Sequence, residues 1–171
     1  PPADDPELDS PRMPGVPFEE LRRRASEAWD AGRLDEADRF FRAGVELNPL
    51  WYEGWFYVGS IHFARGRFER AQGTLRRVLD AVPDSGPAWV LLGFSEFRLG
   101  HYDRAEAALI RGLSLGLEES EDIQAGAHHH LSLLKTRRGD FEGAVEHLGY
   151  PLHLGGVAES LSAASPERTA G

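Results

Sequence analysis

Three consecutive histidines, His128 to His130, are the residues of this chain whose type most readily suggests chemistry. Imidazole nitrogens bind metal ions and exchange protons near neutral pH. Successive residues of a helix point about 100° apart, so three neighbours cannot face one ion. A metal site would need a pair spaced four residues apart, or a partner from another helix such as His62 or His101. We therefore expect these histidines to pack or to face solvent, with a pH-sensitive rim as the weaker alternative.

Acidic residues are the other candidates for chemistry, because Asp30, Glu53 and Glu96 could supply a carboxylate pair. The sequence fixes no nucleophile beside a base and contains neither a glycine-rich phosphate loop nor a cysteine. It thus predicts a protein without enzymatic activity, cofactor or metal ion.

The charge distribution argues against nucleic acid as the partner. The net charge is −9, and basic runs such as Arg22–Arg24 and Arg137–Arg138 are short. Binding to a phosphate backbone requires a basic stripe. No stretch approaches the ~20 apolar residues of a membrane span. The expected partner is another protein, and the expected compartment is the cytoplasm, or the periplasm if a signal peptide preceded Pro1.

The elements that must position these residues recur along the chain. Three glycines are spaced 34 residues apart, and a fourth follows after 39. A bulky apolar residue lies two positions after each glycine, an alanine five positions after it, and a small residue seven positions before it. The four columns are Gly32, Gly66, Gly100 and Gly139; Leu34, Phe68, Tyr102 and Phe141; Ala37, Ala71, Ala105 and Ala144; and Ala25, Gly59, Gly93 and Ser132. A period of this length indicates one supersecondary unit stacked on itself.

Each unit has the pattern of a helix, a tight turn and a second helix. In the second cycle, the stretch from Tyr52 to Gly66 has apolar residues three or four apart. Its final glycine suits the left-handed residue that closes a helix. A second apolar stripe runs from Phe68 to Val82 and stops at Pro83.

The small residues of these columns are expected where the two helices of a unit cross. Gly59 with Ala71, and Gly93 with Ala105 one cycle later, would let the helix axes approach closely. Such units cannot bury their apolar faces alone, so neighbouring units must stack.

The pattern resembles the tetratricopeptide repeat family over roughly residues 18 to 150. The residues that carry the resemblance in the second and third cycles are Trp55, Val58, Gly59, Gly66, Phe68, Ala71, Leu75 and Pro83, then Trp89, Leu92, Gly93, Gly100, Tyr102, Ala105 and Leu109. The first cycle departs from the pattern at Arg24, and the fourth carries His128 in place of the tryptophan. The resemblance implies an all-α fold in which about four helix-turn-helix units stack as a right-handed α-solenoid. The family's well-known clamp for chaperone tails is not expected, because only Arg22 of its matching positions is charged.

Composition predicts three segments. Residues 1–17 are rich in proline and acidic residues, which predicts an extended leader. Residues 18–150 form the expected repeat domain, and residues 151–171, rich in Ser, Ala and Gly, a mostly mobile tail. The expected units are 18–51, 52–85, 86–117 and 123–150. An acidic loop or a helix start at residues 116–124 accounts for the longer last interval.

The first helix of each unit should line the concave side of the stack, and five of the residues expected there are aromatic. An exposed patch of that kind usually marks a binding surface, with aromatic and Arg side chains as anchors. The predicted partner-binding residues are Arg22, Trp29, Phe56, Ser60, Phe63, Val90, Phe94, Phe97, Arg98, His129, Leu133 and Arg137. The alternative is that part of this set belongs to the core, because Phe63 and Phe97 can pack between neighbouring first helices.

The sequence therefore predicts an adaptor that binds a peptide segment of a partner protein in an aromatic-lined groove. Three alternatives stay open. The chain could be a structural subunit of an assembly, because Pro151 shortens the last helix and leaves Leu148 without cover, so the oligomeric state is open. It also resembles bacterial type III secretion chaperones for translocators in size, acidity and helical layout. Finally, leader residues 12–18 could occupy the groove themselves.

Overall fold

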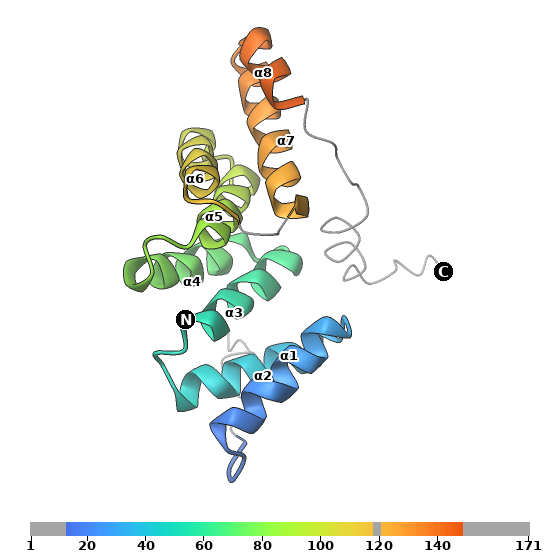
Figure 1. The fold of residues 1–171 in the computed structure, drawn as a ribbon, viewed down its shortest axis with the longest axis vertical. Coiled ribbons are helices and arrows are strands. Elements are labelled where there is room, and N and C mark those ends of the chain that lie inside the picture. The colour runs from blue at the N-terminus through green and yellow to red at the C-terminus, as the bar shows by residue number, and fades with distance from the viewer. Residues whose placement is uncertain (1–12, 118–120, 149–171) are drawn as a thin grey trace, which may run out of the picture.

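The computed structural model of the chain describes residues 13–117 and 121–148. Within these ranges the backbone forms eight α-helices and no strand. The helices are α1 (Phe18–Asp30), α2 (Leu34–Leu47), α3 (Tyr52–Ala64), α4 (Phe68–Ala81), α5 (Gly86–Arg98), α6 (Tyr102–Leu115), α7 (Glu121–Arg137) and α8 (Phe141–Leu148). Consecutive helices form four pairs that stack along the long axis of the molecule (Figure 1). The predicted all-α fold of tandem helix-turn-helix units is confirmed.

Successive pairs pack through their neighbouring helices. The second helix of each pair contacts the first helix of the next, so α2 packs on α3, α4 on α5 and α6 on α7. The first helices also contact one another, because α5 touches both α3 and α7. The helix α5 therefore has neighbouring helices on several sides, and these reduce the exposure of its side chains.

Each pair turns at the predicted glycine. Gly66 has a φ of 71°, and its N–H donates to the carbonyl of Phe63 at 2.9 Å. The N–H of Arg67 donates to the carbonyl of His62 at 2.8 Å. These two bonds close the helix around a left-handed residue, a conformation that glycine adopts without a Cβ clash. The three equivalent glycines have φ values of 68°, 79° and 77°, so the predicted tight turns are confirmed.

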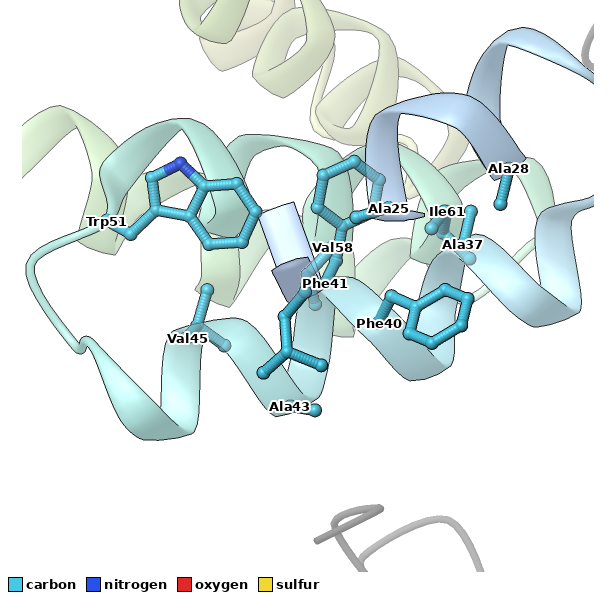
Figure 2. Packing of buried hydrophobic residues seen from close by; sticks show 11 residues of the cluster. Ala25, Ala28, Ala37, Phe40, Phe41, Ala43, Val45, Trp51, Val58 and Ile61 are labelled. Atoms are coloured by element: carbon cyan, nitrogen blue, oxygen red, sulfur yellow. The ribbon is translucent and has the colours of Figure 1, made fainter. Parts of the chain in front are cut away.

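The apolar core is divided into layers along the stack. In the first layer, the buried ring of Phe41 in α2 stacks on Tyr57 of α3, with ring centroids 4.6 Å apart. The same ring lies 5.6 Å from Trp51, and Figure 2 shows both among smaller side chains. Two further layers are built around the fully buried Leu75 of α4 and Leu109 of α6. Rings thus join the first pair to the second, whereas aliphatic side chains dominate further along.

Small residues at the crossings bring the paired helices together. A Cβ atom on Gly93 would lie 2.7 Å from Leu109 Cγ and 3.2 Å from the carbonyl oxygen of Ala105, so α5 and α6 cross at the predicted pair. In the second pair, a Cβ atom on Gly59 would likewise meet the side chain of Leu75, at 3.1 Å. The same sequence column therefore faces the equivalent leucine in both repeats, and the fit is tighter in the third.

Ion pairs that the sequence columns did not reveal join successive repeats. Arg65, which immediately precedes a turn glycine, places its two terminal nitrogens 2.6 Å from carboxylate oxygens of Asp35 and Asp38 in the preceding repeat. Arg138 has the equivalent position in the fourth repeat and pairs with the two equivalent carboxylates of α6. The middle junction has Leu99 at this position and so lacks the arrangement.

A buried carboxylate takes the place of that arrangement at the middle junction. Glu96 is only 2% exposed, and its two oxygens lie 2.9 Å from Arg76 Nη2 and 2.7 Å from His101 Nδ1. A buried charge of this kind is tolerated when it is paired and hydrogen-bonded. Glu96 is thus engaged between α4 and the α5–α6 turn, and it forms no carboxylate pair with Asp30 or Glu53.

The described part of the predicted leader packs on the first repeat. Met13, Val16 and Phe18 lie against its core, and the Phe18 ring is 5.2 Å from Trp51. Every second or third residue of this stretch is therefore engaged with the core, while Pro14, Gly15 and Pro17 are exposed. The rest of the leader and the predicted tail at residues 151–171 lie outside the described residues, so the segment boundaries stay predictions. No helix in the described ranges is both long and apolar enough to cross a membrane.

Candidate partner-binding surface

Half-buried rings on the first helices form two clusters, and the first cluster contains Trp29 and Phe56. Trp29 of α1 has its ring centroid 5.0 Å from that of Tyr57 in α3. Phe56, also in α3, lies 5.6 Å from the same tyrosine. Because Tyr57 is held by the buried Phe41, both rings are fixed from below while part of each faces solvent. Tyr57 is thus a positioning residue.

The second cluster runs across three repeats, and we call it the ring row: Phe63 of α3, Phe94 and Phe97 of α5, and His130 of α7. The ring centroids of Phe63 and Phe94 are 6.2 Å apart. His130 lies 4.6 Å from Phe94 and 4.9 Å from Phe97. Phe63, Phe97 and His130 are half-buried. The row therefore offers a discontinuous aromatic surface that crosses successive first helices.

Three of the predicted partner-binding residues are buried, and the expectation that Phe94 faces solvent is wrong. Phe94 is 5% exposed, Val90 0% and Ser60 6%. Phe94 is covered because α3 and α7 both close on α5, and Val90 faces α6 where Gly112 lets the helices touch. The Ser60 hydroxyl donates to the carbonyl of Phe56 at 2.9 Å. These residues support the surface from beneath.

Three other predicted residues lie on the surface outside both clusters. Arg22 is exposed and forms an ion pair of 2.9 Å with Glu19 one turn earlier on α1. His129 is half-buried beside His130, and Leu133 is 42% exposed. The structure thus gathers only part of the predicted set around the rings.

The remaining two predicted residues, Arg98 and Arg137, each stack on a ring of the preceding repeat. The Arg98 guanidinium lies 4.4 Å from the Phe68 centroid, and that of Arg137 lies 4.2 Å from the Tyr102 centroid. Each arginine stands two positions before a turn glycine, and each ring stands two positions after the preceding one. The sequence did not predict Tyr102 as a surface residue. The signal was present, because the position two residues after the turn glycine has a large apolar or aromatic side chain in every repeat.

His130 has a defined role within the ring row. Its Nδ1 lies 2.8 Å from the carbonyl oxygen of Gly126 and therefore carries the proton that is donated there. The neutral ring then presents Nε2 as an acceptor. Burial lowers the pKa of His130 below its usual value of 6.5, and the nearby charges of His129 and Arg98 act in the same direction against the opposing Gly126 bond. The row is therefore uncharged at neutral pH.

We expect acid to destabilise the fold through this histidine. Because its pKa is lower in the folded chain, the unfolded chain binds more protons below about pH 6.5, so stability is full above that pH and falls as pH decreases through it. Urea unfolding of His130→Phe should show a weaker loss between about pH 7.5 and 5.5. Part of the slope should persist, because burial also lowers the pKa of His62 and His128. If the free energy of unfolding falls equally steeply as the pH decreases in the wild type and in His130→Phe, His130 does not cause the loss.

The three consecutive histidines do not converge. His128 is buried, with its Nδ1 3.0 Å from Nδ1 of His147 in α8, whereas His130 points to the carbonyl of Gly126. Among the described residues, no group of three or more His, Cys, Asp or Glu side chains is arranged to hold a metal ion. The spacing argument from the sequence thus agrees with their placement.

Stacked helix pairs with left-handed glycine turns and a ring-bearing surface on their first helices define an α-helical repeat protein. Two family models described as tetratricopeptide repeat match residues 22–86 and 62–127, which together cover more than half of the chain. The chain belongs to the tetratricopeptide repeat family. Proteins of this family are typically protein-interaction modules.

Solved structures share the fold. MamA from Desulfovibrio magneticus RS-1, from residue 41 to its end, aligns with a TM-score of 0.66 and 21% identity over 88% of this chain and 78% of that one. A further crystal structure of MamA aligns with a TM-score of 0.66 and 19% identity over 85% and 79%. At such identities the likeness concerns the fold alone, and the predicted right-handed α-solenoid is confirmed.

A curated human relative matches part of the chain. Protein O-mannosyl-transferase TMTC1 is 31% identical over 75 residues, which is 44% of this chain and 8% of that protein. The chain therefore spans a small fraction of this relative. The match supports the repeat assignment and carries no reaction with it.

Proposed function

We propose that the chain is a non-enzymatic adaptor that binds a peptide segment of a partner protein across its first helices. The observation that carries the proposal is the ring row, in which the half-buried rings of Phe63, Phe97 and His130 gather around the buried Phe94 at centroid distances of 4.6–6.2 Å. Half-buried aromatic side chains are typical anchors of protein interfaces. Membership of a family of interaction modules supports the same function.

The surface favours a segment that is extended or helical and carries apolar side chains at intervals. Phe56 and Trp29 offer one contact region, and Phe63 with Phe97 offers another one repeat away. A partner side chain seated at each region would gain by removing ring surface from water. Regular spacing of apolar residues is the feature that segments recognised by grooves commonly share.

The absence of an enzymatic role is part of this proposal. General acid–base chemistry needs a titratable side chain held within hydrogen-bond reach of the proton that it transfers. Glu96 is held by Arg76 and His101, while Asp30 and Glu53 lie exposed on different repeats.

Selection from random 16-residue peptides displayed on phage tests the proposal. We expect the wild-type chain to enrich peptides with spaced apolar residues. The variant Phe56→Ala/Phe97→Ala should bind the best peptide about 30-fold or more weakly, because it lacks two anchors. The control Phe141→Ala removes a ring that is 67% exposed on α8, outside both clusters, and should bind like the wild type. Circular dichroism checks that each variant is folded.

Two results would contradict the peptide-binding proposal. One is a selection in which no peptide is enriched over background. The other is a selected peptide that binds the double variant and the wild type equally well. In either case the first-helix rings are not the binding surface.

A second candidate function is that of a structural subunit, and α8 favours it. Phe141, Val145 and Leu148 are 67%, 65% and 60% exposed and follow the spacing of one helix face. In the preceding repeats, the positions equivalent to Leu148 are fully buried, as Leu75 and Leu109 illustrate. Contact with another molecule would cover this face, and a solution mass of one chain at high concentration would argue against self-association.

A further inference from the structure

A surface cavity of about 400 Å³ lies where the third and fourth repeats meet. Residues 100–104, which form the α5–α6 turn and the start of α6, line one side, and the end of α7 lines the other with Leu134, Arg137 and Arg138. Among these residues, the predicted surface included only Arg137. The cavity is therefore a feature that the aromatic surface does not account for.

The positive charges of the cavity exceed the carboxylates available to them. Arg138 forms ion pairs with both Asp103 and Glu106, so the one acidic residue of the lining is already neutralised. Lys135 lies 3.3 Å from Asp140 and 3.5 Å from Glu106, so its charge is matched by a carboxylate of its own. Within the part of the chain that the structure describes, Arg104 and Arg137 form no ion pair with any carboxylate. Two uncompensated guanidinium groups thus remain in a chain whose net charge is −9.

The arrangement of Arg137 leaves its hydrogen-bond donors available. The central carbon of its guanidinium lies over the Tyr102 ring, 4.2 Å from the ring centroid. A stacked guanidinium is held in place through its face, while its N–H groups point outward along its edges. Those edges suit the two oxygens of a carboxylate or a phosphate.

The first turn of α6 adds to the positive electrostatic potential of the cavity. The helix begins at Tyr102, and its N-cap residue His101 makes no side-chain cap bond. The backbone N–H groups at the start of a helix carry a partial positive charge, and Asp103, the acidic residue of this first turn, is itself engaged by Arg138. This contribution reinforces the two arginines.

The cavity is continuous with the ring row. The Phe97 ring lies 5.6 Å from Tyr102, which lines the cavity, and 4.9 Å from His130 on the other side. A peptide segment that covers the ring row and continues beyond Phe97 therefore reaches Tyr102 and Arg137. An anionic group at that point of the segment would meet the two free arginines.

We propose that this cavity binds an anionic group, a carboxylate or a phosphate, carried by the partner segment next to its apolar residues. The inference rests on the proposed peptide-binding function and specifies the chemistry of the ligand at one end of the surface. Arg104 and Arg137 bind the anion, Tyr102 positions Arg137, and Arg138 neutralises the carboxylates that would otherwise repel it.

The random-peptide selection described above tests the proposal when it is run in parallel on two further variants. Wild-type chain should enrich Asp or Glu at a fixed distance from the apolar residues. Arg104→Ser/Arg137→Ser should lose this acidic preference while it keeps the apolar one. The control Arg33→Ser/Arg39→Ser also removes two exposed arginines, both far from the cavity in the first repeat, and should keep both preferences.

Affinities of synthetic peptides make the same comparison quantitative. Replacing the selected Asp or Glu by its amide should weaken binding to the wild type about tenfold or more, because a charge-assisted hydrogen bond is lost. The same replacement should have little effect on binding to Arg104→Ser/Arg137→Ser. A third peptide with phosphoserine at that position identifies the source of the anion: tighter binding indicates a phosphate, and equal or weaker binding a carboxylate.

The outcomes separate this inference from the function on which it rests. Enrichment of apolar residues without an acidic preference overturns the anion site and leaves the adaptor function standing. An acidic preference that survives in Arg104→Ser/Arg137→Ser also overturns it, because the anion must then bind elsewhere. If no peptide is enriched at all, the proposed function fails and the anion site fails with it.

Discussion

Phe41→Ala should lower the free energy of unfolding by about 3–5 kcal/mol, the largest effect that we expect from a single substitution in this chain. Phe41 is 0% exposed, and its ring contacts those of Tyr57, Trp51 and Trp29 at centroid distances of 4.6, 5.6 and 6.5 Å. Alanine would leave a cavity between the first two repeats, because the rings around it are held on three different elements. The variant should therefore lose both the buried area and the ring contacts.

Urea unfolding measures this loss, with far-UV circular dichroism and tryptophan fluorescence recorded on the same samples. Coincident transitions justify the use of one free energy for the array. Phe141→Ala is the matched control, since its ring is 67% exposed, and we expect a change within about 0.5 kcal/mol. A loss below about 1 kcal/mol for Phe41→Ala would mean that the aromatic layer contributes little beyond an ordinary surface position.

Gly112→Ala should destabilise the fold by about 1–3 kcal/mol even though alanine is the better helix former. A Cβ atom at Gly112 in α6 would lie 2.6 Å from Val90 Cγ2, 2.9 Å from the carbonyl oxygen of Gly86 and 3.0 Å from the Val90 nitrogen. Two of these atoms belong to the backbone of α5 and cannot rotate away. Relief would require the two helices to separate, which would open the core around the fully buried Val90.

Gly73→Ala is the matched control for that substitution, because it makes the same chemical change inside a helix. A Cβ atom at Gly73 in α4 would meet nothing within 4 Å. We therefore expect a stabilisation of about 0.5–1 kcal/mol from helix propensity alone. Opposite signs at Gly112 and Gly73 in urea unfolding would support the close approach of α5 and α6. Stabilisation by both substitutions would show that the helices are not in contact there.

The candidate surface could be predicted in part, and the two phenylalanines of α5 show why. Phe94 and Phe97 both belong to an apolar, first-helix pattern, and both were expected to face the partner. Phe97 stays half-exposed, whereas Phe94 lies where α3 and α7 both reach α5. The difference depends on two neighbouring repeats, and helical periodicity reports only which residues share a face.

The proposed anion site illustrates the same limit. The sequence predicted Arg137 as a rim residue. Its neighbours Arg104 and Tyr102 lie beside it only because the fourth repeat packs on the third. The ion pairs of Arg65 and Arg138 recur at fixed offsets from the turn glycines, so a search for charge columns could have found them. These charged residues stand at other distances from the turn glycines than the apolar residues do. A pattern of apolar residues alone therefore does not reveal the ion pairs.

The amino-acid pattern was sufficient for the number of repeats and the turns, because these depend on interactions within a few residues. Gly66 illustrates this, since its left-handed backbone and the two bonds that close α3 are local properties. Contacts between repeats were settled by packing in three dimensions. They selected which rings stay exposed, which arginines find carboxylates and which remain free. Those outcomes depend on side chains about 30 or more residues apart in sequence, as Phe94 and His130 are, whose meeting no local period encodes.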